Sequence, residues 1–237
     1  MFVQAHRGFS AAAPQNTGPA FVKAVEIGAD GIECDVHFTA DRKMVVIHNF
    51  TVDETSDGRG EVNRQTLAQL RALDFGAWMG EEFRGTRILT LEEMLELVRG
   101  MRIINIELKG DQSVYPGLPE QVCALAARMG LSDRLLISSF DHEMAVAAKK
   151  ADPGIRIGLL YDWEMEHPAE YAKHLGADAI HPHHGFLTRE QVEACREAGV
   201  DVNPWTVDDP GRALTLRDWG CTSVITNRPD VILAALS

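Results

Sequence analysis

The stretch IECDVHFTADRKMVVIHN, residues 32–49, places two acids inside one apolar run and ends a second apolar run on a histidine. The run at 31–36 has the length and the aliphatic content of a buried β-strand. Side chains two positions apart on a strand point to the same side, so Glu33 and Asp35 face together and Cys34 faces away from them. We therefore expect a strand that carries a pair of carboxylates, followed by a run that delivers His48 to the same region.

Short apolar runs alternate with longer helical patterns along the whole chain. Glycine stands at the end of helical segments directly before the next strand, as in KHLGADAI and RDWGCTSVI, which is typical of βα units in series. We predict strands at 2–6, 31–36, 103–108, 135–139, 156–161, 178–181, 200–205 and 222–226, and helices at 16–28, 90–99, 118–130, 141–151, 167–176, 188–199, 209–219 and 229–236.

Eight such units favour a (β/α)8 TIM barrel that forms a single domain over residues 1–237; the alternative is an open, doubly wound sheet. A dinucleotide-binding open sheet would carry GxGxxG after its first strand, and HRGFSAAAPQNT does not match it. Polar residues also cluster at or near the C-terminal ends of the predicted strands, where barrel enzymes place their chemistry. These residues are His6, Glu33, Asp35, Glu107, Lys109, His181 and Trp205.

Residues 50–88 interrupt the repeat after the second barrel strand. They contain SDGRGEV, the short helical pattern QTLAQLRAL and the aromatic residues Phe75, Trp78 and Phe83. Long insertions in compact domains are often functional. We expect an insertion or cap that folds over the barrel mouth, or else a surface loop with a small core of its own.

Composition limits the partners of this chain of 237 residues. Its net charge of −12 disfavours binding to nucleic acid, which needs clustered Lys and Arg. An anionic small molecule stays possible if local cations or a metal offset the acidic background. No apolar run is long enough for an integral membrane segment, the N-terminus does not look like a signal peptide, and the four cysteines are far apart. These features predict a cytoplasmic protein with reduced thiols, and they leave the oligomeric state open.

The predicted barrel rim gathers carboxylates and cations. Glu107 and Lys109 share a side of their strand, as Glu33 and Asp35 do. Carboxylates that converge there either share a proton, pair with Arg7, Lys109 or a backbone donor, or hold a divalent cation. Oxygen ligands favour Mg²⁺ or Ca²⁺ over zinc.

Two histidines, His6 and His48, end apolar runs beside these acids. One histidine at a strand end is usually structural, but two around a carboxylate cluster are suited to act as general base and general acid. Arg7 and Lys109 supply fixed positive charge for a phosphate oxygen. This set of groups favours phosphoryl transfer over acyl transfer, which would need a positioned Ser or Cys nucleophile.

The motifs of the chain also resemble those of the glycerophosphodiester phosphodiesterase family, in particular its short, cytoplasmic bacterial type. AHRGFSAAAPQNT is similar to the family's HRG–PENT opening, GIECDVHFTADRKMVVIHN to its ExDV and HD segment, and IELKG to its ExK strand. PWTVDDP and ITNRP are similar to its C-terminal blocks, so the resemblance extends in order from Ala5 to Pro229.

The resemblance implies a TIM barrel with a short insertion after the second strand and a divalent cation, Mg²⁺ or Ca²⁺. It implies that Glu33, Asp35 and Glu107 bind the metal and that His6 and His48 form the acid–base pair. Arg7 and Lys109 would then hold the phosphate. Trp205 would offer an apolar face to the glycerol or the leaving group, or would simply be a core or rim aromatic.

The implied substrate is a small-molecule glycerophosphodiester, hydrolysed to glycerol 3-phosphate and an alcohol. Two alternatives stay open: a phosphodiesterase that acts on lysophospholipids or other diesters, and a barrel that binds phosphate esters without turning them over.

Two positions depart from the family motifs. Gln15 stands where PENT has an acid, next to Asn16, and Asn49 stands where the HD motif has aspartate. Gln15 removes a negative charge, and Asn49 is less able than an aspartate to stabilise an imidazolium. The stretch IHPHHGF adds His181, which we expect at the rim near the leaving group rather than in a zinc site.

Overall fold

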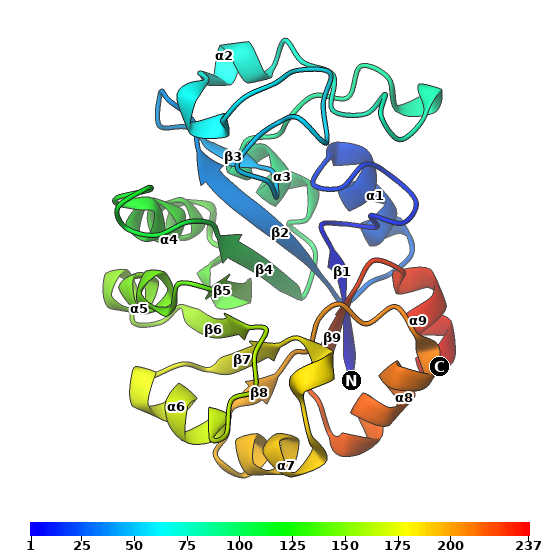
Figure 1. Ribbon diagram of the computed structural model, residues 1–237, viewed down its shortest axis with the longest axis vertical. Coiled ribbons are helices and arrows are strands. Elements are labelled where there is room, and N and C mark those ends of the chain that lie inside the picture. Colours follow the sequence, from blue (N-terminus) through cyan, green and yellow to red (C-terminus); the bar gives the residue numbers. More distant parts are fainter.

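Eight parallel β-strands lie side by side at the centre of the molecule, and helices surround them in the computed structural model of residues 1–237 (Figure 1). The strands pair in the order β8-β7-β6-β5-β4-β2-β1-β9. The two ends of this sheet meet, because Thr222 N donates to Val202 O at 2.9 Å and Ile225 N donates to Pro204 O at 3.0 Å. The predicted TIM barrel is confirmed, and the alternative of an open sheet is wrong.

The helices and strands follow the alternating order expected from the sequence. The strands are β1 (Phe2–His6), β2 (Gly31–Phe38), β3 (Met44–Val46), β4 (Ile103–Leu108), β5 (Leu135–Ser139), β6 (Arg156–Tyr161), β7 (Ala179–Pro182), β8 (Asp201–Val202) and β9 (Ser223–Thr226). The helices are α1 (Gly18–Glu26), α2 (Leu67–Leu70), α3 (Leu91–Leu97), α4 (Leu118–Met129), α5 (His142–Ala151), α6 (Pro168–Leu175), α7 (Arg189–Glu197), α8 (Pro210–Trp219) and α9 (Pro229–Leu236).

Side chains at the N-termini of several helices fix where these helices begin. Thr90 and Glu93 form a reciprocal capping box at α3, and Thr188 and Gln191 form another at α7. The carboxylate of Asp141 accepts hydrogen bonds from two backbone N–H groups at the start of α5. Each cap satisfies donors that a helix leaves free, which typically contributes about 1 kcal/mol. The helix starts expected at 90, 141 and 188 therefore have a local physical cause.

The apolar core lies between the barrel strands and the surrounding helices. Its 49 buried residues include Cys34 and Ile106, which alternate with the acids of β2 and β4. All four cysteines are buried and unpaired. No helix combines the length and the apolar character that crossing a membrane requires.

Strand β8 is shorter than the strand expected at 200–205, since it covers only Asp201–Val202. Pro204 has no N–H to donate to a neighbouring strand. Trp205 makes only a single parallel bridge, to His183. The backbone that carries Trp205 is therefore a loop at the end of the strand.

Residues 50–88 form the block at the top of Figure 1, above the antiparallel pair of β2 and β3. Their apolar side chains pack in a second core together with two residues of the β3 run; its members are Val45, Ile47, Val52, Val62, Leu70, Phe75 and Ile88. Trp78 stays outside this core, with 46% of its surface exposed. The expected small core is present, while the role of the insertion as a cap stays a prediction.

Gly158 and His181 form a close contact inside the barrel that is open to a direct test. A Cβ atom on Gly158 would lie 2.5 Å from His181 Nε2, so Gly158→Ala should destabilise the fold by about 1–3 kcal/mol through overpacking. In a His181→Ala background the same change should cost less, because the clashing ring is gone. Urea unfolding of the four proteins would measure this coupling, and additive effects of the two changes would contradict it.

Candidate active site

Three adjacent strands bring the predicted acids together at one end of the barrel. His6 ends β1 opposite Glu33 of β2, and Asp35 of β2 lies opposite Glu107 of β4. One carboxylate oxygen from each of Glu33, Asp35 and Glu107 lies within 4.8 Å of the other two. All three residues are buried. Strand register thus converts acids far apart in the sequence into one cluster.

Two cations flank this cluster. Lys109 Nζ donates to Glu107 Oε1 at 2.7 Å and lies 3.5 Å from Asp35 Oδ1. Arg7 Nε lies 3.5 Å from Asp35 Oδ2, and the Arg7 backbone N–H donates to Glu33 Oε2 at 3.1 Å. The acids therefore do pair with Arg7 and Lys109, which was one of the alternatives that the sequence analysis left open. Two cations still leave three carboxylates with an excess of negative charge.

The pKa values of the acids reflect first their burial and then this excess of negative charge. Burial, reinforced by Asp35, raises the pKa of Glu33 well above its usual range and that of Glu107 to about 7. Burial would also raise the pKa of Asp35, but Lys109 and Arg7 outweigh it and hold that pKa below its usual range. Only Asp35 is thus stabilised as a carboxylate by the protein alone.

Two observations favour a divalent cation in this cluster: the chemistry of its donor atoms, and one buried oxygen that faces Lys109 at 3.5 Å without a hydrogen bond. Asp35 Oδ1 is buried and has no hydrogen-bond partner. An oxygen in this state is costly unless another group binds it. Three carboxylate oxygens are the ligands that Mg²⁺ and Ca²⁺ prefer, and a cation would stabilise the charged forms of Glu33 and Glu107.

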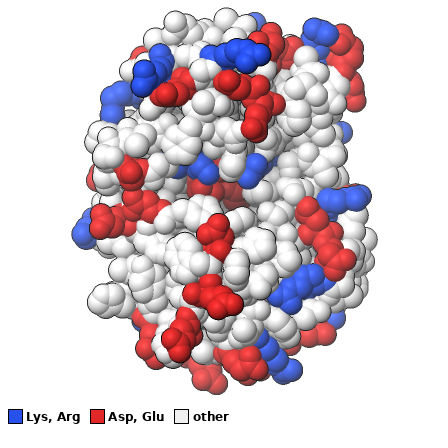
Figure 2. Space-filling view, viewed as in Figure 1, with Lys and Arg blue, Asp and Glu red and all other residues white.

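Charged side chains of both signs are spread over the face drawn in Figure 2, and near its middle a red patch lies between two blue ones. The chain as a whole carries a net charge of −12. Binding of an anion at the acid cluster therefore depends on the cations next to it, Arg7 and Lys109, as the composition led us to expect.

His6 is held by residues from the far end of the chain. Its Nδ1 lies 2.7 Å from Asn227 Oδ1, and its Nε2 lies 3.8 Å from Glu33 Oε2. Asn227 is in turn fixed by Asp208, whose Oδ2 accepts from Asn227 Nδ2 at 2.8 Å. Asn227 and Asp208 were not singled out from the sequence. They lie in the ITNRP and PWTVDDP blocks, and the similarity of these blocks to the family's C-terminal motifs is the signal that could have identified both residues.

His48 is held through both its ring and its backbone. Its Nδ1 lies 2.5 Å from Asn49 Oδ1, and Asn49 Nδ2 donates to Glu54 Oε2 at 2.7 Å. The backbone oxygen of His48 is 3.2 Å from His37 Nε2, and His37 Nδ1 is 2.8 Å from the hydroxyl of Tyr115. Glu54, His37 and Tyr115 were missed in the sequence because no local pattern distinguishes them.

Both histidines favour the neutral form. Burial, with Arg7 adding to it, lowers the pKa of His6 to about 4, and burial lowers the pKa of His48. A neutral imidazole whose Nδ1–H donates to an amide oxygen presents Nε2 as an acceptor. Each of the two rings is therefore positioned to take a proton.

The loop after β1 surrounds Asp35 and Arg7. Asn16 Nδ2 donates to Asp35 Oδ2 at 2.8 Å, while Arg7 Nη1 donates to Gln15 Oε1 at 2.6 Å. Arg7 and Asn16 have φ values of 56° and 59°, a left-handed conformation that costs side-chain-bearing residues energy. The turn that bends the backbone of Arg7 toward Glu33 is therefore maintained by its surroundings.

A cavity of about 140 Å³ opens between the acids and the two histidines. One wall is apolar and contains Phe140, Leu160, Trp205 and Ile225. Trp205 Nε1 donates to His181 O at 2.8 Å, which fixes the indole in this wall. The cavity is lined by His6, Arg7, Glu33, His48, Asn105, Glu107, Ser138, Phe140, Leu160, Trp205 and Ile225.

The expectation that His181 lies at the rim is wrong. The residue has no exposed surface, it does not line this cavity, and its Nε2 is 3.1 Å from Asn203 Nδ2. Gly158 on the neighbouring strand leaves the room that its ring fills inside the barrel. Burial, followed by Arg156, lowers the pKa of His181 to about 3. The backbone oxygen of His181 accepts from Trp205, while its ring lies inside the barrel rather than facing a ligand.

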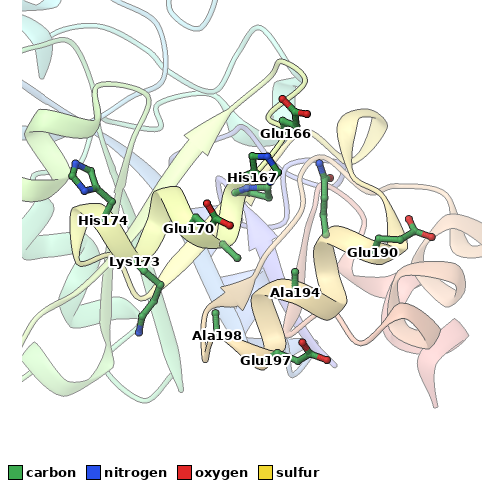
Figure 3. Close-up of a pocket in the computed structure, with 12 residues that line it drawn as sticks. Glu166, His167, Glu170, Lys173, His174, Glu190, Ala194, Glu197 and Ala198 are labelled. Carbon is green, nitrogen blue, oxygen red and sulfur yellow. The ribbon is translucent and has the colours of Figure 1, made fainter.

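A larger cavity, of about 820 Å³, lies outside the barrel between α6 and α7 (Figure 3). It contains none of the candidate site residues. Its glutamates, among them Glu166, Glu190 and Glu197, are spread along the groove and do not converge on one point. Size alone therefore does not locate the chemistry, and the smaller cavity, where the acids and histidines meet, is the candidate active site.

Comparison with protein families gives one extensive match. Residues 6–231 match the model of the "Glycerophosphoryl diester phosphodiesterase family". A glycerophosphodiester phosphodiesterase of Caldanaerobacter subterraneus subsp. tengcongensis is 40% identical over 232 residues, which cover 98% of this chain and 96% of that protein. A glycerophosphodiester phosphodiesterase of Bacillus altitudinis is 35% identical, with 95% of this chain and 94% of that protein covered.

A solved structure extends the match to three dimensions. A phosphodiesterase from Oleispira antarctica, in complex with the product sn-glycerol-3-phosphate, superposes with a TM-score of 0.89 at 32% identity. The alignment covers 100% of this chain and 96% of that one.

Cation binding should stabilise the protein more at high pH than at low pH. The raised pKa of Glu107, about 7, means that the folded apoprotein keeps a proton that the unfolded chain, with a pKa of about 4.3, has already lost. Loss of this proton between these values costs stability. A bound cation removes the cost, but below pH 7 it must compete with the proton.

Thermal unfolding with and without Mg²⁺ or Ca²⁺ would measure this effect. A cation concentration of 100 times the Kd measured at pH 8 should add about 2.7 kcal/mol, or roughly 5–10 °C in Tm, at pH 8. The same concentration should add clearly less at pH 5.5. Glu107→Gln is the matched control and should lose most of the gain. An equal gain at both pH values would contradict the assignment.

Proposed function

The chain belongs to the glycerophosphoryl diester phosphodiesterase family, and from this premise we propose that it hydrolyses glycerophosphodiesters to glycerol 3-phosphate and an alcohol. The observation that carries the proposal is the convergence of Glu33, Asp35 and Glu107 between two cations and two histidines. Phosphoryl transfer needs these groups because its catalysis consists largely of positioning and charge stabilisation. The product bound to the Oleispira antarctica phosphodiesterase supports the same substrate class.

We assign the binding of a divalent cation, Mg²⁺ or Ca²⁺, to Glu33, Asp35 and Glu107. When bound, the cation neutralises part of the carboxylate charge and stabilises negative charge on the phosphate oxygens. Arg7 and Lys109, each beside Asp35, supply the remaining positive charge at fixed positions. Trp205 gives the glycerol an apolar surface to pack against.

The reaction begins when one histidine takes the proton of the glycerol 2-hydroxyl, whose oxygen then forms a bond to phosphorus. The other histidine gives a proton to the leaving oxygen as its bond to phosphorus breaks. The cyclic phosphate that remains is opened by water, which yields glycerol phosphate. The histidine that acts as acid must first be protonated, and the phosphodiester anion bound next to it favours this.

The surroundings of His6 and His48 support this pairing. Each ring has its Nδ1 held by the oxygen of an amide side chain, Asn227 or Asn49. Neither Nε2 atom has a hydrogen-bond partner in the protein, so both are able to bind the substrate. We also propose that residues 50–88 act as a cap, since Trp78 lines a cavity together with His6 and Arg7.

A lysophospholipid or another diester is the second candidate substrate. It is favoured by exposed aromatic side chains on the loops that follow four strands: Phe50, Phe140, Trp163 and Phe186. An apolar rim of this kind would suit a substrate with an acyl chain.

Removal of either histidine should abolish most of the activity. His6→Ala and His48→Ala should each lower turnover of glycerophosphodiesters by about 10² or more, because each removes one proton-transfer group. Release of glycerol 3-phosphate measures this, with His174→Ala on the exposed face of α6 as the matched control. Full activity of both variants would refute the mechanism.

The products should identify the substrate class. With a mixture of glycerophosphodiesters and lysophospholipids, we expect glycerol 3-phosphate as the main product. Lysophosphatidic acid instead would favour the second candidate. Hydrolysis of a generic aryl phosphodiester that a chelator stops would exclude a protein that only binds phosphate esters.

A further inference from the structure

Another cavity, of about 560 Å³, adjoins the catalytic one and shares His6 and Arg7 with it. It is formed by the loop after β1, the insertion and the loops around β9. Three of its residues are exposed, so it opens to solvent. Its lining consists of His6, Arg7, Ser10, Ala11, Gln15, Trp78, Asp208, Asn227 and Arg228.

The geometry of phosphoryl transfer requires two directions away from phosphorus. The attacking and leaving oxygens lie roughly in line on opposite sides of it. The catalytic cavity, of about 140 Å³, suits the small glycerol unit that all these substrates share. The alcohol on the other side varies in size and needs the larger, open space that begins at His6 and Arg7.

We propose that this adjoining cavity binds the leaving alcohol. It selects alcohols that are uncharged and carry several hydroxyl groups, such as glycerol or inositol. The inference rests on the proposed function and goes beyond it, because it names the class of the leaving group. Trp78 and Arg228 are the residues that determine this specificity.

The polar groups of the cavity fit hydroxyls better than an ammonium group. Gln15 Oε1 accepts from Arg7, and this leaves the amide nitrogen of Gln15 without a partner in the protein and able to donate. The guanidinium of Arg228 faces Asp230 at 3.7 Å, a loose and half-exposed ion pair that leaves N–H donors free. Both groups donate hydrogen bonds that a hydroxyl oxygen accepts and an ammonium group does not.

The cavity's carboxylate is already engaged. Asp208 accepts hydrogen bonds from Thr226 Oγ1 at 2.9 Å, from Asn227 N at 2.8 Å and from Asn227 Nδ2 at 2.8 Å. These bonds position the partner of His6. An ammonium head group would therefore find Arg7 and Arg228 on the walls and no carboxylate dedicated to it.

Trp78 supplies the apolar wall. Its Nε1 donates to Phe75 O at 3.0 Å, so the small core of the insertion holds the ring while 46% of the residue stays exposed. A single aromatic ring packs against the C–H face of a polyol. Strong recognition of a quaternary ammonium group uses a cage of several rings, and Trp78 is the only ring from Phe, Tyr or Trp in this lining.

The test compares leaving groups with the glycerol phosphate part held constant. We would measure kcat/KM for glycerophosphoglycerol, glycerophosphoinositol, glycerophosphocholine and glycerophosphoethanolamine with the cation present. The wild type should prefer the two polyol substrates by about tenfold or more. Trp78→Ala and Arg228→Ala should each reduce the ratio of polyol to choline kcat/KM by about tenfold, the size expected for loss of one charged hydrogen bond or one packing surface.

Two further variants control for structural damage. Trp78→Phe keeps a ring and should keep most of the preference. Tyr171→Ala removes an exposed aromatic residue of α6, 37% against 46%, that lines neither cavity, and should leave the ratio unchanged. Thermal unfolding of each variant would show that it is folded.

The possible results separate this inference from the proposed function. A wild type that prefers choline or shows no preference overturns the inference alone. An equal loss for all four substrates in Trp78→Ala and Arg228→Ala also overturns it, because the cavity would then hold the shared glycerol. Absence of glycerol 3-phosphate from every substrate overturns the proposed function and this inference with it.

Discussion

The repulsion among three buried carboxylates is the constraint on which the active site depends. Glu33, Asp35 and Glu107 lie within 4.8 Å of one another, and the protein alone stabilises the charge of only Asp35. The arrangement persists because Arg7 and Lys109 are held beside it and because a barrel of parallel strands fixes the backbone beneath. The same charges that make the protein without a cation less stable therefore favour binding of the proposed cation.

Local sequence patterns predicted the barrel, but the register of strand pairing determines which side chains meet in the candidate site. Alternation along β2 was enough to place Glu33 and Asp35 on one side, with Cys34 in the core. No local rule states that Asp35 lies opposite Glu107, or that Asn227 holds His6 from 221 residues away. The first contact comes from the pairing of β2 with β4, and the second from the pairing of the last strand, β9, with the first, β1.

His181 shows where the same reasoning failed. Its position at the end of an apolar run resembles that of His6, and both were expected at the rim. The difference lies in the neighbouring strand, where Gly158 leaves space for one ring inside the barrel. Whether a side chain at a strand end faces solvent or the interior thus depends on the residue beside it, which periodicity does not reveal. The small core of residues 50–88 was predicted for the opposite reason, since its apolar residues are close in sequence.

The two departures from the family motifs act in the same direction. Gln15 keeps a hydrogen bond to Arg7, and Asn49 keeps one to His48, so the geometry on both sides of the site is maintained. Each amide also removes a negative charge that an acid would bring. A carboxylate does stand behind His48, but it belongs to Glu54 and acts through the amide of Asn49. Under the proposed function the substrate is an anion that binds beside the cluster of Glu33, Asp35 and Glu107, so these substitutions would reduce repulsion where its phosphate binds. The loss of charge support for His48 is the corresponding cost, and under the proposed mechanism it would fall on proton transfer rather than on binding.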